Sequence, residues 1–256
     1  MARRWGCVVR LIVDILFPRA CVRCGREGSD VCPSCWSVAS GVCVSLVCPS
    51  CHKLSSIGSL HAGCSSSLDG LIFSMPYVDG VTHGLLRRWK FDYVRSVEPH
   101  LKRLIERMPL AEILPGDDWL VVPVPLHERR KRERGFDQAA WIAKTVADLL
   151  HLPAANALER TRYTKQQSLQ PARRTKSVNV SRSGHSPERF SARTNVHSDG
   201  CRAGGLDGAF RARMPIEGRV ILCDDVFTSG ATMEAAAEAC RDAGATSVWG
   251  VTIAKG

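Results

Sequence analysis

The 256-residue sequence contains no apolar run that reaches the roughly 18 residues needed to cross a membrane as a helix, so we expect no membrane span. A semi-apolar stretch at 7–17 is interrupted by Arg10 and Asp14. No small-x-small cleavage site follows it, which argues against a signal peptide. We interpret residues 1–20 as a short amphipathic helix that ends at Pro18, and the protein as cytoplasmic.

Acidic residues are fewer than basic ones: 25 Asp and Glu stand against 35 Lys and Arg, for a formal net charge of +10. This surplus favours anionic partners such as phosphorylated metabolites or nucleic acid. Apolar residues make up 45% of the chain, a share typical of a globular protein and not of a disordered one. The length suits one medium-sized domain together with a small module.

Twelve cysteines in a reducing compartment indicate metal binding rather than disulfides. Three Cys-x-x-Cys pairs and one His-x-x-Cys pair lie in the segment 21–68, and two such pairs complete the tetrahedral shell of a structural zinc ion. The predicted ligands are Cys21, Cys24, Cys32, Cys35, Cys48, Cys51, His61 and Cys64, with His61 the least secure. Sequential pairing, 21/24 with 32/35 and 48/51 with 61/64, is the simplest arrangement and gives two ions. An interleaved pairing, or one ion with spare thiols, stays open.

The stretch 219–233 predicts an anion site at a strand–turn–helix junction. Residues 220–223 read as a buried strand that ends in two carboxylates, and a helix is expected at 234–243. Free N–H groups and the positive end of the helix dipole meet at such a turn. The predicted ligand contacts are Asp224, Asp225, Thr228, Ser229, Gly230, Ala231 and Thr232. The hydroxyl and N–H donors suit a phosphate, and the two acids suit the two hydroxyls of a diol. A ribose 5-phosphate has both groups, so the pattern predicts this ligand. The alternative is an ordinary junction of an α/β protein.

Other apolar patterns predict the remaining elements of an α/β domain. The expected strands are 71–78, an edge strand broken by Pro76, then 119–125, and 246–254 beside strand 220–223. The expected helices are 81–90, 95–108 and 139–150. Lys90 ends the first of these helices and is interpreted by default as a solvated lysine, with a role at the ligand site left open.

A basic loop follows strand 119–125 and includes Arg130, Lys131 and Arg134. Open α/β sheets bind ligands at the carboxyl ends of parallel strands, and Arg can hold a pyrophosphate through two parallel hydrogen bonds. We therefore assign these three residues to a pyrophosphate group. The alternative is a solvated, charged helix start.

The stretch 219–233 resembles the 5-phosphoribosyl-1-pyrophosphate (PRPP) signature of type I phosphoribosyltransferases. Together with the cysteine pairs, the Val-Pro-Val-Pro run at 122–125 and the Arg-Gly-Phe-x-Gln-Ala run at 134–139, the chain resembles the ComF family, of ComFC or GntX type. The resemblance implies a type I phosphoribosyltransferase fold, a mostly parallel sheet flanked by helices, at 69–256, with a Cys-rich zinc module at 21–68. Family members usually have Asn where this chain has Asp137, so either this carboxylate points away from the ligand or binding is weaker.

A further part of the resemblance lies in the region where type I enzymes close a mobile loop over the substrate and exclude water. It is carried by Arg160, Thr164, Gln167, Leu169, Arg173 and Arg174. Arg173 and Arg174 are therefore assigned to catalysis. The segment 175–206 is rich in Ser, Arg and Gly with one aromatic residue, and we interpret it as a disordered surface insertion. An insertion in the loop that should close over the substrate would interfere with catalysis, but it need not affect PRPP binding.

Two functions follow from these observations. The first is PRPP binding with Mg²⁺ and transfer of ribose 5-phosphate to an unidentified acceptor, of which a nucleobase is one candidate. Residues 228–232 then hold the 5-phosphate, while Asp224 and Asp225 hold the ribose hydroxyls. The second function is that of a non-catalytic DNA-uptake protein that binds single-stranded DNA or a helicase partner. The acid pair separates the two, because a DNA groove has no use for two carboxylates there.

Overall fold

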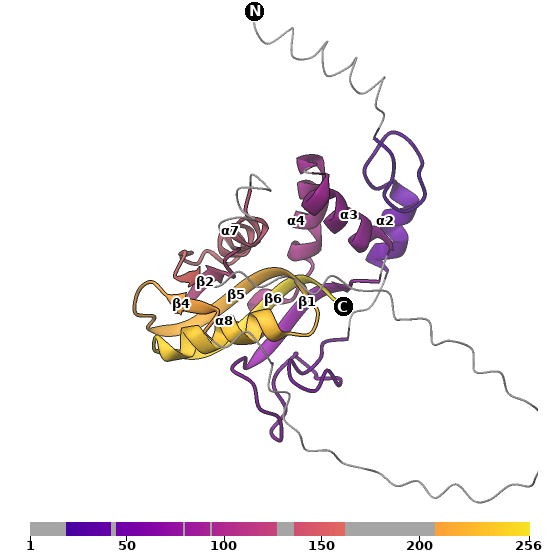
Figure 1. Ribbon diagram of the computed structural model, residues 1–256. Coiled ribbons are helices and arrows are strands. Elements are labelled where there is room, and N and C mark those ends of the chain that lie inside the picture. Colours follow the sequence, from indigo (N-terminus) through magenta and orange to yellow (C-terminus); the bar gives the residue numbers. More distant parts are fainter. Residues whose placement is uncertain (1–18, 42–44, 79, 93, 127–135, 162–207) are drawn as a thin grey trace, which may run out of the picture.

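In the computed structural model, the described residues are 19–41, 45–78, 80–92, 94–126, 136–161 and 208–256. They form an α/β fold around a four-stranded, all-parallel sheet (Figure 1). The strand order is β1 (Gly70–Pro76), β6 (Ala245–Lys255), β5 (Gly218–Phe227) and β2 (Trp119–Pro123). A separate antiparallel pair is formed by β3 (Leu158–Arg160) and β4 (Phe210–Ala212). The predicted fold class, a parallel sheet flanked by helices with a Cys-rich N-terminal part, is confirmed.

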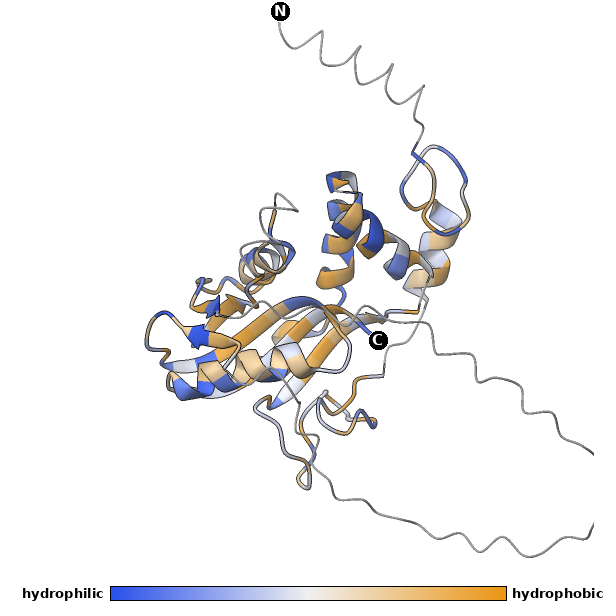
Figure 2. Ribbon diagram, viewed as in Figure 1, coloured by the Kyte–Doolittle hydropathy of each residue, from blue (hydrophilic) through white to orange (hydrophobic). Residues whose placement is uncertain are grey.

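Two apolar layers bury the two faces of the sheet. One layer packs α3 (Gly80–Phe91), α4 (Glu98–Glu106) and α7 (Gln138–Leu150) on one face, and the other packs α8 (Ala231–Asp242) on the opposite face. Along β5, Ile221 and Cys223 belong to the first layer while Val220 and Leu222 belong to the second. This alternation is that of a central strand buried on both faces, and Figure 2 shows the sheet strands coloured as hydrophobic over most of their length.

The predicted elements agree with the structure where the apolar pattern is long. The strand predicted at 220–223 lies inside β5, β6 lies beside it, and β1 is an edge strand that ends at Pro76. The helix predicted at 95–108 is instead a 3₁₀ turn, η1 (Arg95–Val97), followed by α4, whose first turn carries Pro99. Sequence analysis missed the short elements α2 (Pro33–Ser40), α5 (Leu110–Ile113), β3 and β4.

The Cys-rich segment 21–68 contacts both faces of the sheet. Its first part places Cys21, Cys32 and Ala39 in the layer of α3 and α4. Its second part places Val47 and Leu68 in the layer of α8. The segment reaches the edge strand β1 where Ser59 and Gly70 form an isolated antiparallel bridge. The two predicted zinc sites therefore belong to different sides of the sheet.

Several predicted features lie outside the described residues. They are residues 1–18 of the predicted N-terminal helix, the basic residues Arg130, Lys131 and Arg134, the pair Arg173 and Arg174, and the predicted insertion at 175–206. Among the helices that are described, none combines the length and apolar character that crossing a membrane requires.

Candidate functional site

The two predicted acids lie near the carboxyl end of β5, the strand flanked by β6 and β2. The prediction that they end the strand is wrong, because β5 continues to Phe227 by pairing with β6, while its pairing with β2 stops at Cys223. The segment 224–227 thus projects beyond β2. This leaves the acid pair at the edge of the sheet where parallel α/β folds bind ligands.

Burial controls the protonation of Asp224. Desolvation and the neighbouring charge of Asp225 raise the pKa of the Asp224 carboxyl to about 7, although the Asp225 N–H, Lys90 and Arg160 act in the opposite direction. The Asp225 N–H donates a hydrogen bond to Oδ1 of Asp224 over 2.8 Å. Asp224 can therefore gain or lose a proton near neutral pH, which is uncommon for a carboxyl group.

The second acid is paired with a lysine from α3. Lys90 Nζ lies 2.8 Å from Oδ2 of Asp225, and both side chains are nearly buried. The default interpretation of Lys90 as a solvated lysine is therefore wrong. A signal for its position was present in the sequence: Lys90 follows Leu86 by four residues, so it shares the face of α3 that buries Leu86 against the sheet. Arg160, at the end of β3, is a second cation whose charge acts on Asp224; sequence analysis named it only as part of the family resemblance.

The turn after β5 consists of Thr228, Ser229 and Gly230, and α8 begins at Ala231, earlier than the predicted residue 234. Gly230 has a φ of +81°, and a Cβ atom at this position would lie 2.6 Å from the ring of Phe227. Both facts require glycine here. No side chain caps the N-terminus of α8. The first N–H groups of the helix and the hydroxyls of Thr228, Ser229 and Thr232 are therefore gathered at one end of α8.

Asp137 is engaged with its own helix. It is the N-cap residue of α7, and its Oδ1 accepts a hydrogen bond from the N–H of Ala140 over 3.1 Å. A capping carboxylate also interacts favourably with the positive end of the helix dipole. This favours the first of the two expectations for Asp137, a carboxylate directed at its helix and not at a ligand.

The eight predicted metal ligands form two groups, within each of which all four ligand atoms lie within 4.8 Å of one another. The first group consists of Cys21, Cys24, Cys32 and Cys35, and the second group consists of Cys48, Cys51, His61 and Cys64. These are the sequential pairs. A tetrahedron with Zn–S bonds of about 2.3 Å has sulfur–sulfur edges of about 3.8 Å. The distance between the Sγ atoms of Cys24 and Cys32 is 3.7 Å, so the geometry fits a zinc ion.

His61 is oriented as a metal ligand. Its Nε2 lies 3.0 Å from the carbonyl oxygen of Leu54, which can only accept a hydrogen bond, so Nε2 carries the proton. The lone pair of Nδ1 then faces the second group, 3.3 Å from Sγ of Cys51. A metal-binding histidine commonly has its other nitrogen fixed in this way. The second group could therefore hold a zinc ion through three thiolates and one imidazole.

Backbone N–H groups lower the pKa of Cys21 and Cys32 in the first group and of Cys48 in the second group. Burial of the Cys21 thiol opposes its ionisation, but backbone N–H groups, including that of Cys32 at 3.4 Å, outweigh it and lower the pKa to about 6. In the same way, burial opposes ionisation of Cys48, and backbone N–H groups lower its pKa to about 7. A thiolate is the form that binds zinc.

Comparisons with known proteins support the resemblance seen in the motifs. The chain is 29% identical over 130 residues, 50% of its length, to the DNA utilization protein YhgH of Escherichia coli (strain K12). It is 28% identical over 144 residues, 56% of its length, to the Competence protein ComFC of Bacillus subtilis (strain 168). The matches cover 45% and 47% of those proteins, so the chain spans about half the length of the curated relatives it matches. No family model matches the chain. The predicted resemblance to ComFC is confirmed over about half of the chain.

Proposed function

We propose that this protein is a ComF-type phosphoribosyltransferase that binds PRPP at the carboxyl end of β5. The observation that carries the proposal is the acid pair Asp224 and Asp225 beside the uncapped N-terminus of α8. Carboxylates accept hydrogen bonds from a ribose diol, and helix N-terminal N–H groups bind phosphate. Lys90 supports the same reading, because it partly neutralises the two acids before an anionic ligand enters.

In this proposal the residues at the turn bind the 5-phosphate of PRPP, and the acids orient the ribose. The bond between C1 and the pyrophosphate oxygen breaks, and the pyrophosphate leaves with the electron pair. An acceptor nitrogen then forms the new bond to C1 and releases its proton to solvent. Arg130, Lys131 and Arg134 would stabilise the charge of the leaving pyrophosphate, and Arg173 and Arg174 would act from the closing loop. Catalysis of this kind rests on positioning and charge stabilisation.

Metal ions have two roles in the proposal. Mg²⁺ would enter with PRPP as part of the substrate and would offset the negative charge of its pyrophosphate. Zinc is structural: each cysteine group supplies four protein ligands, which leaves no coordination position for substrate. The thiols also suit the reducing cytoplasm, where we place the protein.

Calorimetric titration with PRPP and MgCl₂ tests the proposal. We expect saturable binding by the parent protein and loss of binding in the double variant Asp224→Ala/Asp225→Ala. The double variant Glu238→Ala/Asp242→Ala is the matched control, because it removes two exposed acids from α8 itself. No binding by the parent at millimolar PRPP would contradict the proposal, as would equal loss of binding in both variants. Release of pyrophosphate with a panel of nucleobases then tests transfer.

A second candidate function is that of a non-catalytic protein of DNA uptake. Two observations favour it: the relatives are named for DNA utilization and competence, and the net charge is +10. A protein with this net positive charge would bind single strands with an affinity that falls steeply with salt and depends little on sequence. Fluorescence anisotropy with a labelled oligonucleotide at several salt concentrations tests this function. Salt-dependent binding unaffected by Asp224→Ala/Asp225→Ala would favour it over PRPP binding.

A further inference from the structure

The loop that carries Cys48 and Cys51 contacts the last residue of β5. His52, the residue after Cys51, packs edge-on against Phe227, with their ring centroids 5.8 Å apart. His52 has a φ of +58°, in the left-handed region that non-glycine residues adopt rarely. The N–H of His52 donates a hydrogen bond to the carbonyl oxygen of Cys48 over 3.0 Å, so the loop that carries two of the four metal ligands fixes the backbone from which this exposed ring extends.

Phe227 also contacts the turn that follows it. Its ring lies directly under Gly230, where a Cβ atom would be 2.6 Å away. The carbonyl oxygen of Phe227 accepts a hydrogen bond from the N–H of Gly256 over 2.8 Å, which holds the phenylalanine at the end of β5. Displacing His52 would therefore remove one packing contact of the Phe227 ring, which supports the turn 228–230.

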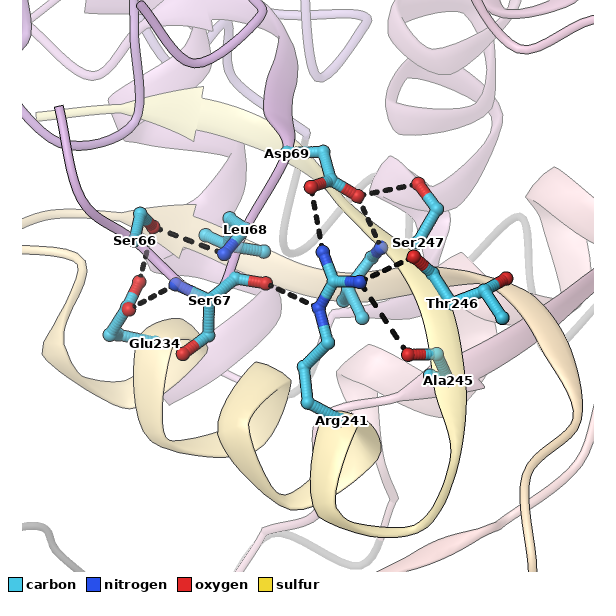
Figure 3. A network of polar contacts seen from close by, with 10 residues as sticks. Ser66, Ser67, Leu68, Asp69, Glu234, Arg241, Ala245, Thr246 and Ser247 are labelled. Atoms are coloured by element: carbon cyan, nitrogen blue, oxygen red, sulfur yellow. Dashed lines mark hydrogen bonds and ion pairs between the residues drawn. The ribbon is translucent and has the colours of Figure 1, made fainter. Parts of the chain in front are cut away.

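A second connection runs from the same cysteine group to the first turn of α8. Glu234 receives two hydrogen bonds from the chain that follows Cys64: Ser66 donates its hydroxyl over 2.6 Å, and Ser67 donates its N–H (Figure 3). The Ser66 hydroxyl oxygen also accepts the N–H of Leu68 over 3.1 Å. Residues 66 and 67, which follow the metal ligand Cys64, thus bind the first turn of α8, next to the predicted phosphate site.

The segment is also fixed at the other end of α8. Arg241 donates to the carbonyl oxygen of Ser67 over 3.2 Å and to Oδ1 of Asp69 over 2.6 Å, as Figure 3 shows. Asp69 in turn accepts the N–H of Val248 and the hydroxyl of Ser247 in β6. Residues 66–69 therefore lie along α8 and are bonded to its first turn, to its last turn and to the sheet.

We propose that the second cysteine group, when it holds its metal ion, positions the phosphate-binding turn, with Glu234 and His52 as the positioning residues. Metal binding at Cys48, Cys51, His61 and Cys64 and phosphoester binding at 228–232 then strengthen each other, because each fixes the segments that the other needs. The first cysteine group lies elsewhere, against α3 and η1, where Asp30 accepts hydrogen bonds from Arg88 of α3 and Ser96 of η1. This inference rests on the proposed phosphate site.

The variant Glu234→Gln tests the connection with the helix. It retains the shape of the side chain but weakens both hydrogen bonds from Ser66 and Ser67, since the negative charge is lost and one acceptor oxygen becomes a donor. We expect two zinc ions per chain by elemental analysis, as in the parent, and an affinity for PRPP with MgCl₂ reduced about tenfold. Glu238→Gln, an exposed glutamate on the same helix, is the matched control and should bind as the parent does. Parent-like affinity of Glu234→Gln would overturn the proposal.

His52→Asn is the second variant, because asparagine tolerates a positive φ but lacks the ring that packs on Phe227. We expect the same direction of change, with zinc content retained. Parent-like affinity of His52→Asn for PRPP would show that the ring contact with Phe227 does not position the turn.

A readout independent of catalysis is the rate at which a coloured chelator removes zinc. We expect PRPP with MgCl₂ to slow removal of one of the two ions in the parent protein, and not in Glu234→Gln. Inorganic phosphate is used as a second probe. If PRPP does not bind but phosphate slows removal of that ion, the proposed phosphoribosyl function fails and the coupling stands. If PRPP binds and both ions leave at unchanged rates, the coupling fails and the proposed function stands.

Discussion

Lys90 and Asp225 form an ion pair across 2.8 Å, with only 10% and 13% of their side chains exposed. The pair joins the end of α3 to the end of β5, two elements that the sequence separates widely. Removing one member of a buried ion pair leaves the other charge without compensation in a poorly solvated position. This pair therefore affects both the stability of the fold and the candidate ligand site.

We predict that Lys90→Met lowers the free energy of unfolding by about 3 kcal/mol, because the Asp225 carboxylate then stays buried without its partner. It should also weaken PRPP binding. Denaturation in urea at pH 7.5 measures the first effect. In the double variant Lys90→Met/Asp225→Asn the uncompensated charge is gone, so we expect at least half of the lost stability to return. A double variant no more stable than Lys90→Met would contradict the assignment of the loss to the ion pair.

The raised pKa of Asp224 predicts a specific pH dependence. The folded-state pKa is about 7, whereas the ordinary value is 3.8, so folding favours the protonated form. The wild-type protein therefore loses stability from this group as the pH rises from about 4 to about 7, with no further loss from it above that range. Asp224→Asn cannot ionise and escapes this loss.

We accordingly expect Asp224→Asn to gain stability relative to wild type as the pH rises, by roughly 2 kcal/mol between pH 4 and pH 8. This value is smaller than the full pKa shift would give, because the side chain of Asp224 is only partly buried. Urea titrations at pH 4, 6 and 8 provide the measurement. A stability difference for Asp224→Asn that stays constant over this range would show that the carboxyl group ionises normally in the folded protein.

The sequential grouping of the cysteines predicts a definite metal content. Elemental analysis should find two zinc ions per chain in the parent protein. Cys24→Ser and Cys51→Ser should each retain one ion, and the double variant none, because each substitution removes one ligand from a different group. An interleaved pairing of 21/24 with 48/51 would instead place Cys24 and Cys51 on the same ion, so the double variant would retain one ion.

Gly230→Ala tests the turn. A φ of +81° costs an alanine about 1 kcal/mol, and the added methyl group must also displace the ring of Phe227. We expect a loss of about 2 kcal/mol in unfolding free energy, together with weaker PRPP binding. Gly41→Ala is the control, since Gly41 has a φ of −82° and its Cβ atom would make only ordinary contacts. Equal destabilisation by the two substitutions would contradict a special role for Gly230.

Local patterns in the sequence predicted β5, α8 and the two cysteine groups. An apolar run, a glycine turn and a Cys-x-x-Cys spacing each act over a few residues, so a single sequence reveals them. The partners of Lys90 and Glu234 were not predicted, because they depend on the packing of distant segments; Ser66 and Glu234 are 168 residues apart. Elements as short as α2 and β3 carry too few residues to show a period. Residues 130, 131, 134, 173 and 174 remain predictions, since they lie outside the described residues.

The pairing of β1 with β6 has a consequence for how the protein is made. Val248 bonds to Asp69, 179 residues away in sequence, so the edge of the sheet forms only after nearly the whole described chain has been synthesised. Folds dominated by such distant contacts acquire their native structure slowly. Each cysteine group spans far fewer residues and can capture its metal ion while the chain is still growing. Early metal capture would shield these thiols from oxidation during the interval before the sheet closes.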